Sequence, residues 1–362
     1  MGSPTNTSDQ RACAARLVLG IESSCDETAV ALVTSDRRIV AERIASQEAA
    51  HAPYGGVVPE IAARAHAERL APMLEAVLSE AGLGLDRVDA IAATAGPGLI
   101  GGVMVGLVSA KALAMASDTP LLAINHLEGH ALSPRLADAD LAFPYLLLLV
   151  SGGHCQILLV EGVGHYRRLA TTIDDALGEA FDKTAKILGL GYPGGPAVER
   201  LACKGDANAV PLPRPLKGSK EPHFSFAGLK SAVLRAHESG EHKDADIAAS
   251  FQRAAIECLI DRLERSLSTI ETPPALVVAG GVAANMAVRS ALEDLASGHA
   301  MRFTAPPLKL CTDNAAMIAW AGCERLLAGG NTIASDPLDF RARPRWPLDP
   351  EAEAARGAGV KA

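Results

Sequence analysis

Residues 16–34 read RLVLGIESSCDETAVALVT, in which a short polar turn separates two apolar runs. The runs at 16–22 and 28–34 are rich in Leu, Val, Ile and Ala, and the Ser, Cys and Asp residues between them are typical of a tight turn. This pattern predicts a β-hairpin. The same plan recurs further along the chain, where PYLLLLV at 144–150 and CQILLV at 155–160 lie on either side of a Ser-Gly-Gly turn.

Strands and helices alternate in the rest of the chain. Residues 88–94 predict a short strand that leads through a glycine-rich bend into a helix of small residues, and residues 120–125 predict another strand. Residues 275–279 predict a strand that ends in two glycines, with a helix beginning near Asn285. These units favour a duplicated α/β architecture of two lobes with a central cleft. Each turn alone fits an ordinary connection, but together they favour phosphate binding, because exposed backbone N–H groups bind anions.

The composition is that of a globular protein with room for two domains, since 49% of the 362 residues are hydrophobic and 21% are charged. The formal net charge of -8 argues against a general nucleic-acid coat and leaves room for a local basic patch. The candidates for such a patch are Arg214, Lys217, Lys220, Lys230 and Arg235. They form either a solvated face or a contact with a phosphate backbone.

The cysteines and the apolar runs predict a cytoplasmic location. The seven cysteines contain no Cys-x-x-Cys pair, as expected of reduced thiols. Residues 1–15 lack the apolar core of a secretory signal and are expected to form a disordered tail. We also expect no membrane span, because no apolar run approaches the roughly 18 residues that one needs.

The sequence GPGLIG at 96–101 matches the G-x-G-x-x-G pattern of dinucleotide-binding loops. It lacks the acidic residue expected about 20 positions further on, and it lacks the Lys-Ser/Thr of a Walker loop. We therefore interpret it as a tight crossing from a strand into a helix.

The sequence NHLEGH at 125–130 places His126 and His130 four residues apart, so both imidazoles lie on one face of a helix. They are either two satisfied polar residues or two metal ligands. Glu128 is two residues from each, which is about 200° of helical rotation, so its carboxylate turns away from them. This spacing differs from the His-Glu-x-x-His of zinc peptidases. Asp313 begins a helix and is either its N-cap or a third ligand, and spacing alone does not bring it to the histidines.

Residues 178–196, GEAFDKTAKILGLGYPGGP, predict an amphipathic helix that ends in a Tyr-Pro-Gly-Gly-Pro turn. Asp182 and Lys183 either form a solvated pair or face the cleft. The turn exposes backbone donors to which a sugar could bind.

From about residue 17 to residue 348 the chain resembles the bacterial TsaD family, the tRNA threonylcarbamoyladenosine transferases, once described as O-sialoglycoprotein endopeptidases. Ten motifs in order carry the resemblance. They are LGIESSCDETAVAL, YGGVVPEIAARAH, TAGPGLIGGVMVG, NHLEGH, LLVSGGH, GEAFDKTAKILGLGYPGGP, FSFAGLK, AGGVAAN, CTDNAAMIAWAG and RPRWPL. Small departures from the family pattern occur at Asn125, Ala227 and Ala283, and none removes an expected ligand.

The resemblance implies the actin/hexokinase/Hsp70-like (ASKHA) fold, an α/β fold with duplicated RNase H-like lobes. The lobes would be residues 16–143 and 144–345, followed by a tail at 346–362, with the last helix, at about 312–328, packing back on the first lobe. The implied activity is transfer of a threonylcarbamoyl group from threonylcarbamoyl-AMP to N6 of adenosine 37 in tRNAs that read ANN codons, with release of AMP.

The resemblance also implies site residues and partners. One divalent metal, iron by the family pattern with zinc as the alternative, would be bound by His126, His130 and Asp313. The adenylate site would contain Leu149, Val150, Ser151, Gly152, Gly153, Asp182, Gly195 and Asn285. The general base is not identified, and its candidates are Glu22, Asp26 and Glu27. The expected partners are the tRNA anticodon loop, the paralogous protein TsaB and the ATPase TsaE.

Three alternative functions are open at this point. A metallopeptidase acting on glycoproteins is disfavoured by the position of Glu128. A non-catalytic ATP-binding scaffold of the same fold would have no need of the two histidines. A sugar kinase would need a catalytic aspartate facing a sugar pocket, and the sequence does not identify one.

Overall fold

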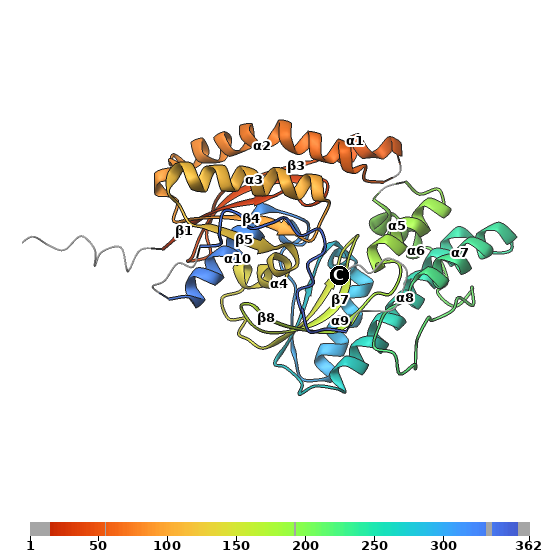
Figure 1. Cartoon of the computed structure of the whole chain (residues 1–362). Helices are drawn as coiled ribbons and strands as arrows, with labels where there is room; N and C mark the ends of the chain where they lie inside the picture. The colour runs from red at the N-terminus through yellow and green to blue at the C-terminus, as the bar shows by residue number, and fades with distance from the viewer. Residues whose placement is uncertain (1–14, 55, 192, 331–334, 354–362) are drawn as a thin grey trace, which may run out of the picture. The chain divides into compact units, whose positions relative to one another are not determined.

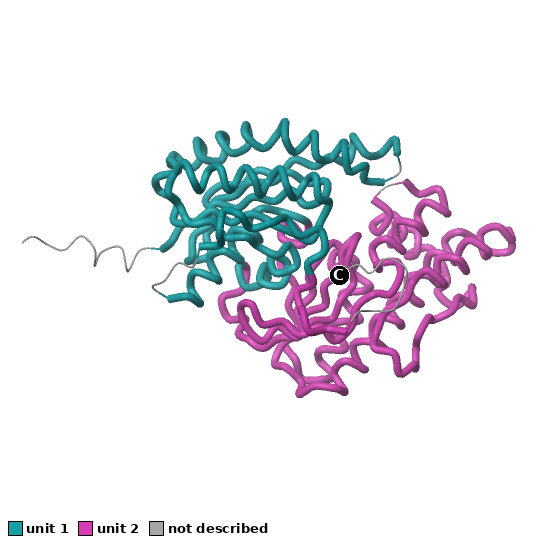
Figure 2. The backbone as a smooth tube through the Cα atoms, viewed as in Figure 1, with its two compact units in different colours: residues 1–136, 313–346 teal, residues 137–312, 347–362 magenta. Residues whose placement is uncertain are grey.

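The computed structural model describes residues 15–353 except 55, 192 and 331–334 (Figure 1). The predicted tail 1–15 lies outside these residues apart from residue 15, as does the end of the predicted tail 346–362. The chain forms two compact units (Figure 2): unit 1 contains residues 1–136 and 313–346, and unit 2 contains residues 137–312 and 347–362. The chain thus leaves unit 1 after Leu136, where the sequence placed the boundary at residue 143, and returns to it at Asp313.

Unit 1 is built on a five-stranded sheet with the order β3-β2-β1-β4-β5. Its strands are β1 (Leu17–Glu22), β2 (Glu27–Thr34), β3 (Ile39–Ser46), β4 (Ala90–Gly96) and β5 (Leu121–Asn125). The predicted first hairpin is confirmed, because β1 pairs antiparallel with β2 and places Gly20 opposite Ala31. β4 pairs parallel with β1 and β5 pairs parallel with β4.

Both faces of this sheet are covered, which explains why β1 is apolar throughout. Successive side chains of a strand point to opposite faces. Leu19 and Ile21 join a core with residues of α2 (Pro59–Ala81) and α3 (Ile100–Ser117). Gly20 faces α10 (Ala315–Ala328), and a Cβ there would lie 2.8 Å from the Cβ of Ala319. Figure 1 shows α2 and α3 on one side of the sheet and α10 on the other.

The remaining described helices of unit 1 are short. They are α1 (Glu48–His51), the 3-10 turns η2 (Ala52–Tyr54) and η3 (Leu85–Arg87), and α4 (His126–Ala137). The GPGLIG sequence is a strand-to-helix crossing as predicted, since β4 ends at Gly96 and α3 begins at Ile100.

The length and composition of α3 contradict one expectation. Its 18 residues, with a mean hydropathy of 1.6, are long and apolar enough to cross a membrane, so the expectation that no apolar run reaches this length is wrong. Core helices meet the same criterion, and α3 packs against β4 and α2, so it is weak evidence for a span. Its outer face exposes Ile100, Met104, Val108 and Met115.

Unit 2 repeats the plan of unit 1, with a sheet of order β10-β9-β6-β7-β8. Its strands are β6 (Tyr145–Val150), β7 (Cys155–Gly162), β8 (His165–Thr171), β9 (Ala275–Ala279) and β10 (Arg302–Thr304). β6 and β7 form the second predicted hairpin, and β9 pairs parallel with β6 as β4 does with β1. Each unit therefore has three antiparallel strands followed by two parallel ones, which confirms the predicted duplication.

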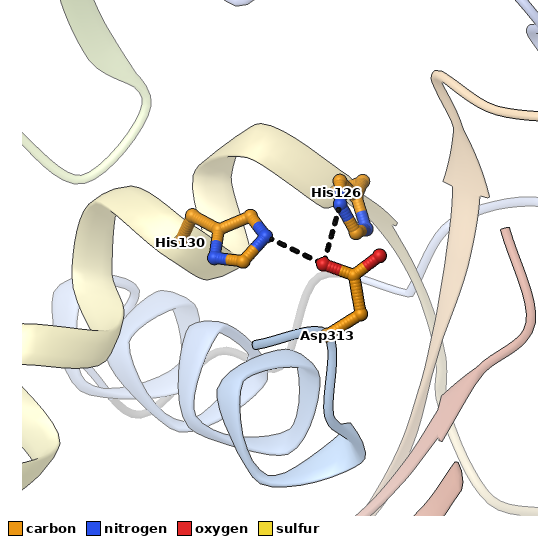
Figure 3. Close-up of side chains that lie close together, drawn as sticks. All are labelled: His126, His130 and Asp313. Carbon is orange, nitrogen blue, oxygen red and sulfur yellow. Dashed lines mark hydrogen bonds and ion pairs between the residues drawn. The ribbon is translucent and has the colours of Figure 1, made fainter. Parts of the chain in front are cut away.

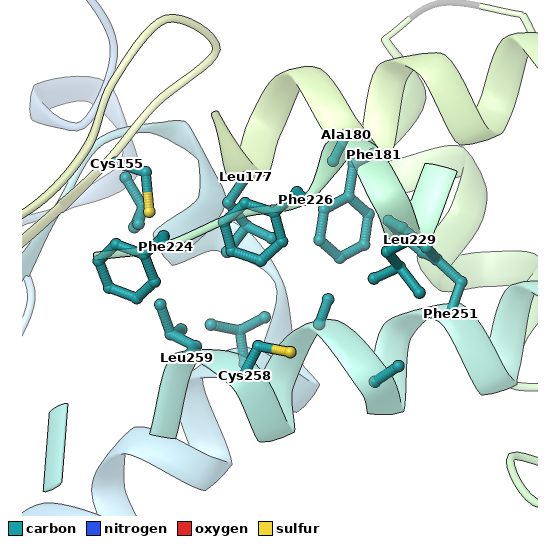
Figure 4. Packing of buried hydrophobic residues seen from close by; sticks show 14 of the residues in the cluster. Cys155, Leu177, Ala180, Phe181, Phe224, Phe226, Leu229, Phe251, Cys258 and Leu259 are labelled. Atoms are coloured by element: carbon teal, nitrogen blue, oxygen red, sulfur yellow. The ribbon is translucent and has the colours of Figure 1, made fainter. Parts of the chain in front are cut away.

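The helices of unit 2 pack around an aromatic core (Figure 4). They are α5 (Leu177–Ile187), α6 (Gly194–Ala202), α7 (Ala227–Ser239), α8 (Asp244–Leu267) and α9 (Met286–Gly298), with 3-10 turns η4 (Gly281–Ala284) and η5 (Leu308–Leu310). Phe181 of α5 meets Phe251 of α8 edge-on, with ring centroids 5.0 Å apart. The amphipathic helix predicted within 178–196 is α5, which ends at Ile187, and the glycines of the predicted turn after it begin a further helix, α6.

Candidate metal centre and phosphate-binding turns

The two histidines lie where β5 passes directly into α4. β5 ends at Asn125 and α4 begins at His126, so His126 and His130 project from the same face of its first turns. Asp313 comes from the segment before α10 (Figure 3). Its Oδ1 lies 3.0 Å from Nε2 of His130 and 3.5 Å from Nε2 of His126. One ligand atom of each residue lies within 4.8 Å of the others.

Asp313 is not the N-cap of α10. Asn314 occupies that position and accepts a hydrogen bond from the backbone N–H of Met317 at 2.8 Å. The backbone N–H groups of the first turn are thus capped by the neighbouring residue. The carboxylate of Asp313 is left to face the imidazoles.

The electrostatics of this group suit a cation. Both imidazoles are buried. Burial alone would lower the pKa of His126, but the charges of Asp313 and Glu22 outweigh it and raise that pKa well above its ordinary value. Burial would raise the pKa of Asp313, but His126 and His130 hold it well below its ordinary value. Two imidazoles and a carboxylate match the donor preferences of divalent first-row metals, and three protein ligands leave coordination positions for a substrate. These residues form a possible metal site.

The carboxylate of Glu22 contacts the ring of His126. Its Oε2 lies 3.0 Å from Nδ1 of His126 and also accepts from the hydroxyl of Thr94 at 2.5 Å. Its Oε1 accepts from the backbone N–H of Ser24 at 2.6 Å. Both oxygens of this buried carboxylate therefore have partners, which argues against Glu22 as a general base and favours an orienting role.

Asp26 and Glu27 follow in the turn and at the start of β2, and both are partly exposed. Burial raises the pKa of Glu27, and the charges of Asp313 and Asp26 raise it further, to about 9. Glu27 therefore carries a proton at neutral pH in this structure. The effect of Asp313 also places Glu27 within electrostatic reach of the candidate metal site.

A polar network beside this turn was not predicted. The buried His66 of α2 has its Nδ1 2.8 Å from the hydroxyl of Thr28 and its Nε2 3.1 Å from the backbone oxygen of Cys25. The side-chain amide of Gln47 also approaches His66. The only signal in the sequence was the position of His66 inside the YGGVVPEIAARAH motif, and that signal specifies no partner.

Glu128 turns away from the two histidines, as its spacing predicted. Its Oε2 accepts from Nη2 of Arg325 on α10 at 2.5 Å, and its side chain is buried. In a zinc peptidase a glutamate beside the histidines acts as general base on the metal-bound water. Glu128 instead pairs with Arg325, so it does not occupy that position.

In unit 2 the predicted adenylate residues lie around the ends of β6 and β9. The two strands are parallel neighbours, so their carboxyl ends lie at the same edge of the sheet. Two glycines, Gly178 and Gly280, allow their own backbone segments to lie close to the backbone of the turn after β6. A Cβ at Gly280 would overlap the carbonyl oxygen of Val150, and a Cβ at Gly178 would lie 2.6 Å from that of Ser151. The start of α5 and the turn after β9 thus both border the turn after β6.

The turn after β6 carries Ser151, Gly152 and Gly153. The two glycines are exposed, and among the described residues no heavy atom beyond their chain neighbours lies within 4 Å of a Cβ placed on either. The hydroxyl of Ser151 accepts from the backbone N–H groups of Gly153 and His154 at 3.3 and 3.1 Å. This is an open, glycine-rich turn of the kind that binds anions.

Asp182 and Gly195 lie together. Oδ1 of Asp182 accepts from the backbone N–H of Gly194 at 2.9 Å. Burial raises the pKa of Asp182 above its ordinary value, although the N–H groups of Gly194 and Gly195 oppose that rise. Leu149 is the buried neighbour of Val150 in β6.

Asn285 is the N-cap of α9, and its amide has partners inside unit 2. Its Oδ1 accepts from the N–H of Val288 at 3.0 Å, and its Nδ2 donates to Oε1 of Gln252 at 2.9 Å. The family resemblance implied that Asn285 contacts the substrate, but the sequence did not show that it caps α9.

Several solved structures have a similar fold. HypF of T. kodakarensis matches with a TM-score of 0.58 at 16% identity, over 87% of this chain and 47% of that one. Component A of the (R)-2-hydroxyglutaryl-CoA dehydratase of Acidaminococcus fermentans matches with a TM-score of 0.51 at 17% identity, over 84% and 96%. With its duplicated sheets, the protein is an α/β protein of the two-lobed ASKHA class that carries a possible metal site.

The family model described as TsaD, tRNA N6-adenosine threonylcarbamoyltransferase, matches residues 38–320. The protein of that name from Erythrobacter litoralis is 78% identical over 347 residues, covering 96% of this chain and 100% of that one. The one from Sphingopyxis alaskensis is 72% identical, covering 96% and 99%. The chain belongs to the tRNA N6-adenosine threonylcarbamoyltransferase family and is a transferase.

Proposed function

We propose that the protein transfers the threonylcarbamoyl group from threonylcarbamoyl-AMP to N6 of adenosine 37 in tRNAs that read ANN codons. In this reaction the N6 amine attacks the carbamoyl carbon, the bond from that carbon to the phosphate oxygen breaks, AMP leaves with the electron pair, and N6 loses a proton. Membership of the family supports the proposal. The observation that carries it is the convergence of His126, His130 and Asp313.

The chemistry needs no protein nucleophile, because the mixed anhydride is already activated. The protein has to hold the adenylate, offset charge that builds on its oxygens and direct the amine. His126, His130 and Asp313 would hold one divalent metal, which is iron by the family resemblance. Such an ion supplies Lewis-acid stabilisation of phosphate and carbonyl oxygens.

The adenylate is assigned to the turns of unit 2. The backbone N–H groups of Gly152 and Gly153 are assigned to its phosphate, because they lie in an open turn, and that of Gly153 would have to exchange the Ser151 hydroxyl for the phosphate. Asp182, held by the start of α6, is assigned to the ribose together with Gly195. Asn285 is assigned a nearby polar contact at the start of α9, which requires its amide to exchange Gln252 for the ligand.

The proton from N6 is assigned to Asp26 or Glu27. Glu22 is not assigned this role, because both of its carboxylate oxygens already have hydrogen-bond partners. Because the pKa of Glu27 is raised to about 9, Glu27 has to lose its own proton before it can accept that of N6.

The chain is proposed to act with the paralogous protein TsaB and the ATPase TsaE. A protein partner is supported by the exposed apolar face of α3, where Ile100, Met104 and Val108 follow one another at helical spacing. A Val108→Asp variant should keep its thermal stability and lose co-elution with TsaB on gel filtration. Unchanged co-elution would show that α3 is not the contact.

The proposed function is tested with a purified tRNA transcript, threonylcarbamoyl-AMP and the partner proteins. We compare wild type with His126→Ala and with the control His237→Ala, which alters an exposed histidine paired with Asp244. Wild type and the control should form the modified nucleoside, and His126→Ala should form little. No transfer by wild type would refute the function, and full transfer by His126→Ala would remove the metal site from it.

A further inference from the structure

We propose that residues 335–346, here called the C-terminal segment, form a surface for the phosphate backbone of the tRNA, presented by Arg341, Arg343 and Arg345. This inference rests on the proposed function and adds a location for the nucleic acid on unit 1. It depends on how the segment is fixed, on the charge it presents and on where it ends.

The C-terminal segment is fixed to unit 1 by hydrogen bonds. The backbone N–H of Arg343 donates to the carbonyl oxygen of Ala95 at 2.7 Å, and that of Gly98 donates to the oxygen of Pro344 at 3.2 Å. Asp336 bonds to β5 twice, through its backbone N–H to Leu121 and through its carboxylate to the N–H of Ala123. Because β5 is an edge strand, these bonds also cover an otherwise open sheet edge.

The side chains of the segment present positive charge. Arg341, Arg343 and Arg345 alternate along it and are all exposed. Within the described residues none of them forms an ion pair with a carboxylate, and Asp339 is the one acidic residue between positions 337 and 347. The guanidinium of Arg343 lies over the ring of Phe340 at 4.8 Å and over that of Trp346 at 5.0 Å. Stacking of this kind holds the charge in place while leaving its N–H groups available.

Three of the five basic residues suggested by sequence already pair with carboxylates, which makes them less available to phosphates. Arg214 and Lys217 both pair with Glu257, at 3.2 and 2.8 Å. Lys230 pairs with Asp175 at 3.6 Å. In a chain of net charge -8, the unpaired arginines of the C-terminal segment are therefore the better match for phosphates.

The segment ends beside the candidate metal centre. The carbonyl oxygen of Trp346 accepts from the side-chain amide of Asn125, the residue before His126, at 3.0 Å. A polynucleotide whose target base approaches that centre would carry its neighbouring phosphates past this position. Phosphate contacts from arginines here would fix the register of the loop without reading its sequence.

The test uses the reconstituted reaction and measures KM for tRNA over a range of salt concentrations. Arg341→Gln/Arg345→Gln removes two charges and leaves the stacked Arg343 in place. The expected result is a roughly tenfold higher KM for tRNA, a KM for threonylcarbamoyl-AMP that does not change, and a salt slope lower by about 1.4 to 1.8 for two lost contacts.

Two variants complete the design. Arg214→Gln/Lys217→Gln removes two charges from the ion-paired cluster and should leave KM and slope near those of wild type. Arg341→Lys/Arg345→Lys keeps the charge and should keep the slope, which separates a charge effect from damage to the fold. Wild-type KM and slope in the Gln double variant would overturn the inference while leaving the function intact. Absence of transfer by wild type would instead remove the function on which the inference rests.

Discussion

The carboxylate of Glu22 lies 3.0 Å from Nδ1 of His126, while Nε2 of the same ring faces Asp313. The two nitrogens of this imidazole therefore have separate partners, one in the interior of the sheet and one in the candidate metal site. A carboxylate behind a ligating histidine fixes its tautomer and its orientation.

Glu22→Gln should weaken metal binding for two reasons. The amide orients the His126 ring less firmly than the carboxylate does, and the substitution removes a buried negative charge. We expect an affinity about 10- to 100-fold lower, measured by calorimetric titration with a divalent metal. A variant that folds with wild-type thermal stability and binds the metal equally well would contradict the orienting role.

Substitutions at Asp313 and Asn314 should distinguish the loss of a candidate metal ligand from the loss of the N-cap of α10. Asp313→Asn should abolish tight metal binding and also lower the stability of the metal-free protein, because it removes the carboxylate that pairs with the buried His126 and His130. Asn314→Ala should cost about 1 kcal/mol of unfolding free energy and leave the three ligands in place. Urea unfolding and metal titration of both variants check this. The opposite pattern would mean that Asp313 is the structural residue.

Glu27 should make the stability of the metal-free protein fall with rising pH. Its pKa of about 9 in the folded state exceeds its ordinary value of 4.5, so the folded protein retains a proton that the unfolded chain has released between these values. The stabilising contribution is complete below about pH 4.5 and is lost as the pH rises through about 9. Glu27→Gln should flatten the decline between pH 5 and pH 9 in urea unfolding. Parallel curves for the variant and wild type would contradict the raised pKa.

Substitutions of the neighbouring glycines Gly280 and Gly281 give a test and a matched control for the proposed adenylate site. Gly280 has a φ of +98°, and a Cβ there would overlap the carbonyl oxygen of Val150. Gly280→Ala should displace the turn after β6 and weaken AMP binding. Gly281 has open space where a Cβ would lie, so Gly281→Ala should bind AMP nearly as wild type does. Fluorescence or calorimetric titration with AMP measures both. Equal binding by the two variants would argue against an adenylate site at these turns.

The strands with apolar runs, including the edge strand β5, could be predicted from sequence, and the charged edge strands could not. β1, β6 and β9 are buried on both faces and appear as continuous apolar runs. The edge strands β3 (IVAERIAS) and β8 (HYRRLAT) carry charged residues and were missed, because an exposed edge needs no such run.

The candidate metal site was predictable only in part. The spacing of His126 and His130 follows from helical geometry. Asp313 lies 183 residues beyond His130, so only the fold or a family resemblance brings them together. Asp and Asn are equally good caps, so the sequence Asp313-Asn314 did not reveal which residue caps α10. The hydrogen bond from Thr94 to Glu22 depends on the pairing of β1 with β4, which local sequence does not encode.

The return of the chain to unit 1 at Asp313 sets an order in which the protein is completed during synthesis. The ribosome produces both histidines early, and the third member of the triad and all of α10 emerge only after residues 137–312 have been made. Until then one face of the first sheet lacks the helix that covers it, and only two of the three candidate metal ligands are present. The nascent chain therefore brings the three candidate ligands together, and closes its first core, only after residues 137–312 have been made.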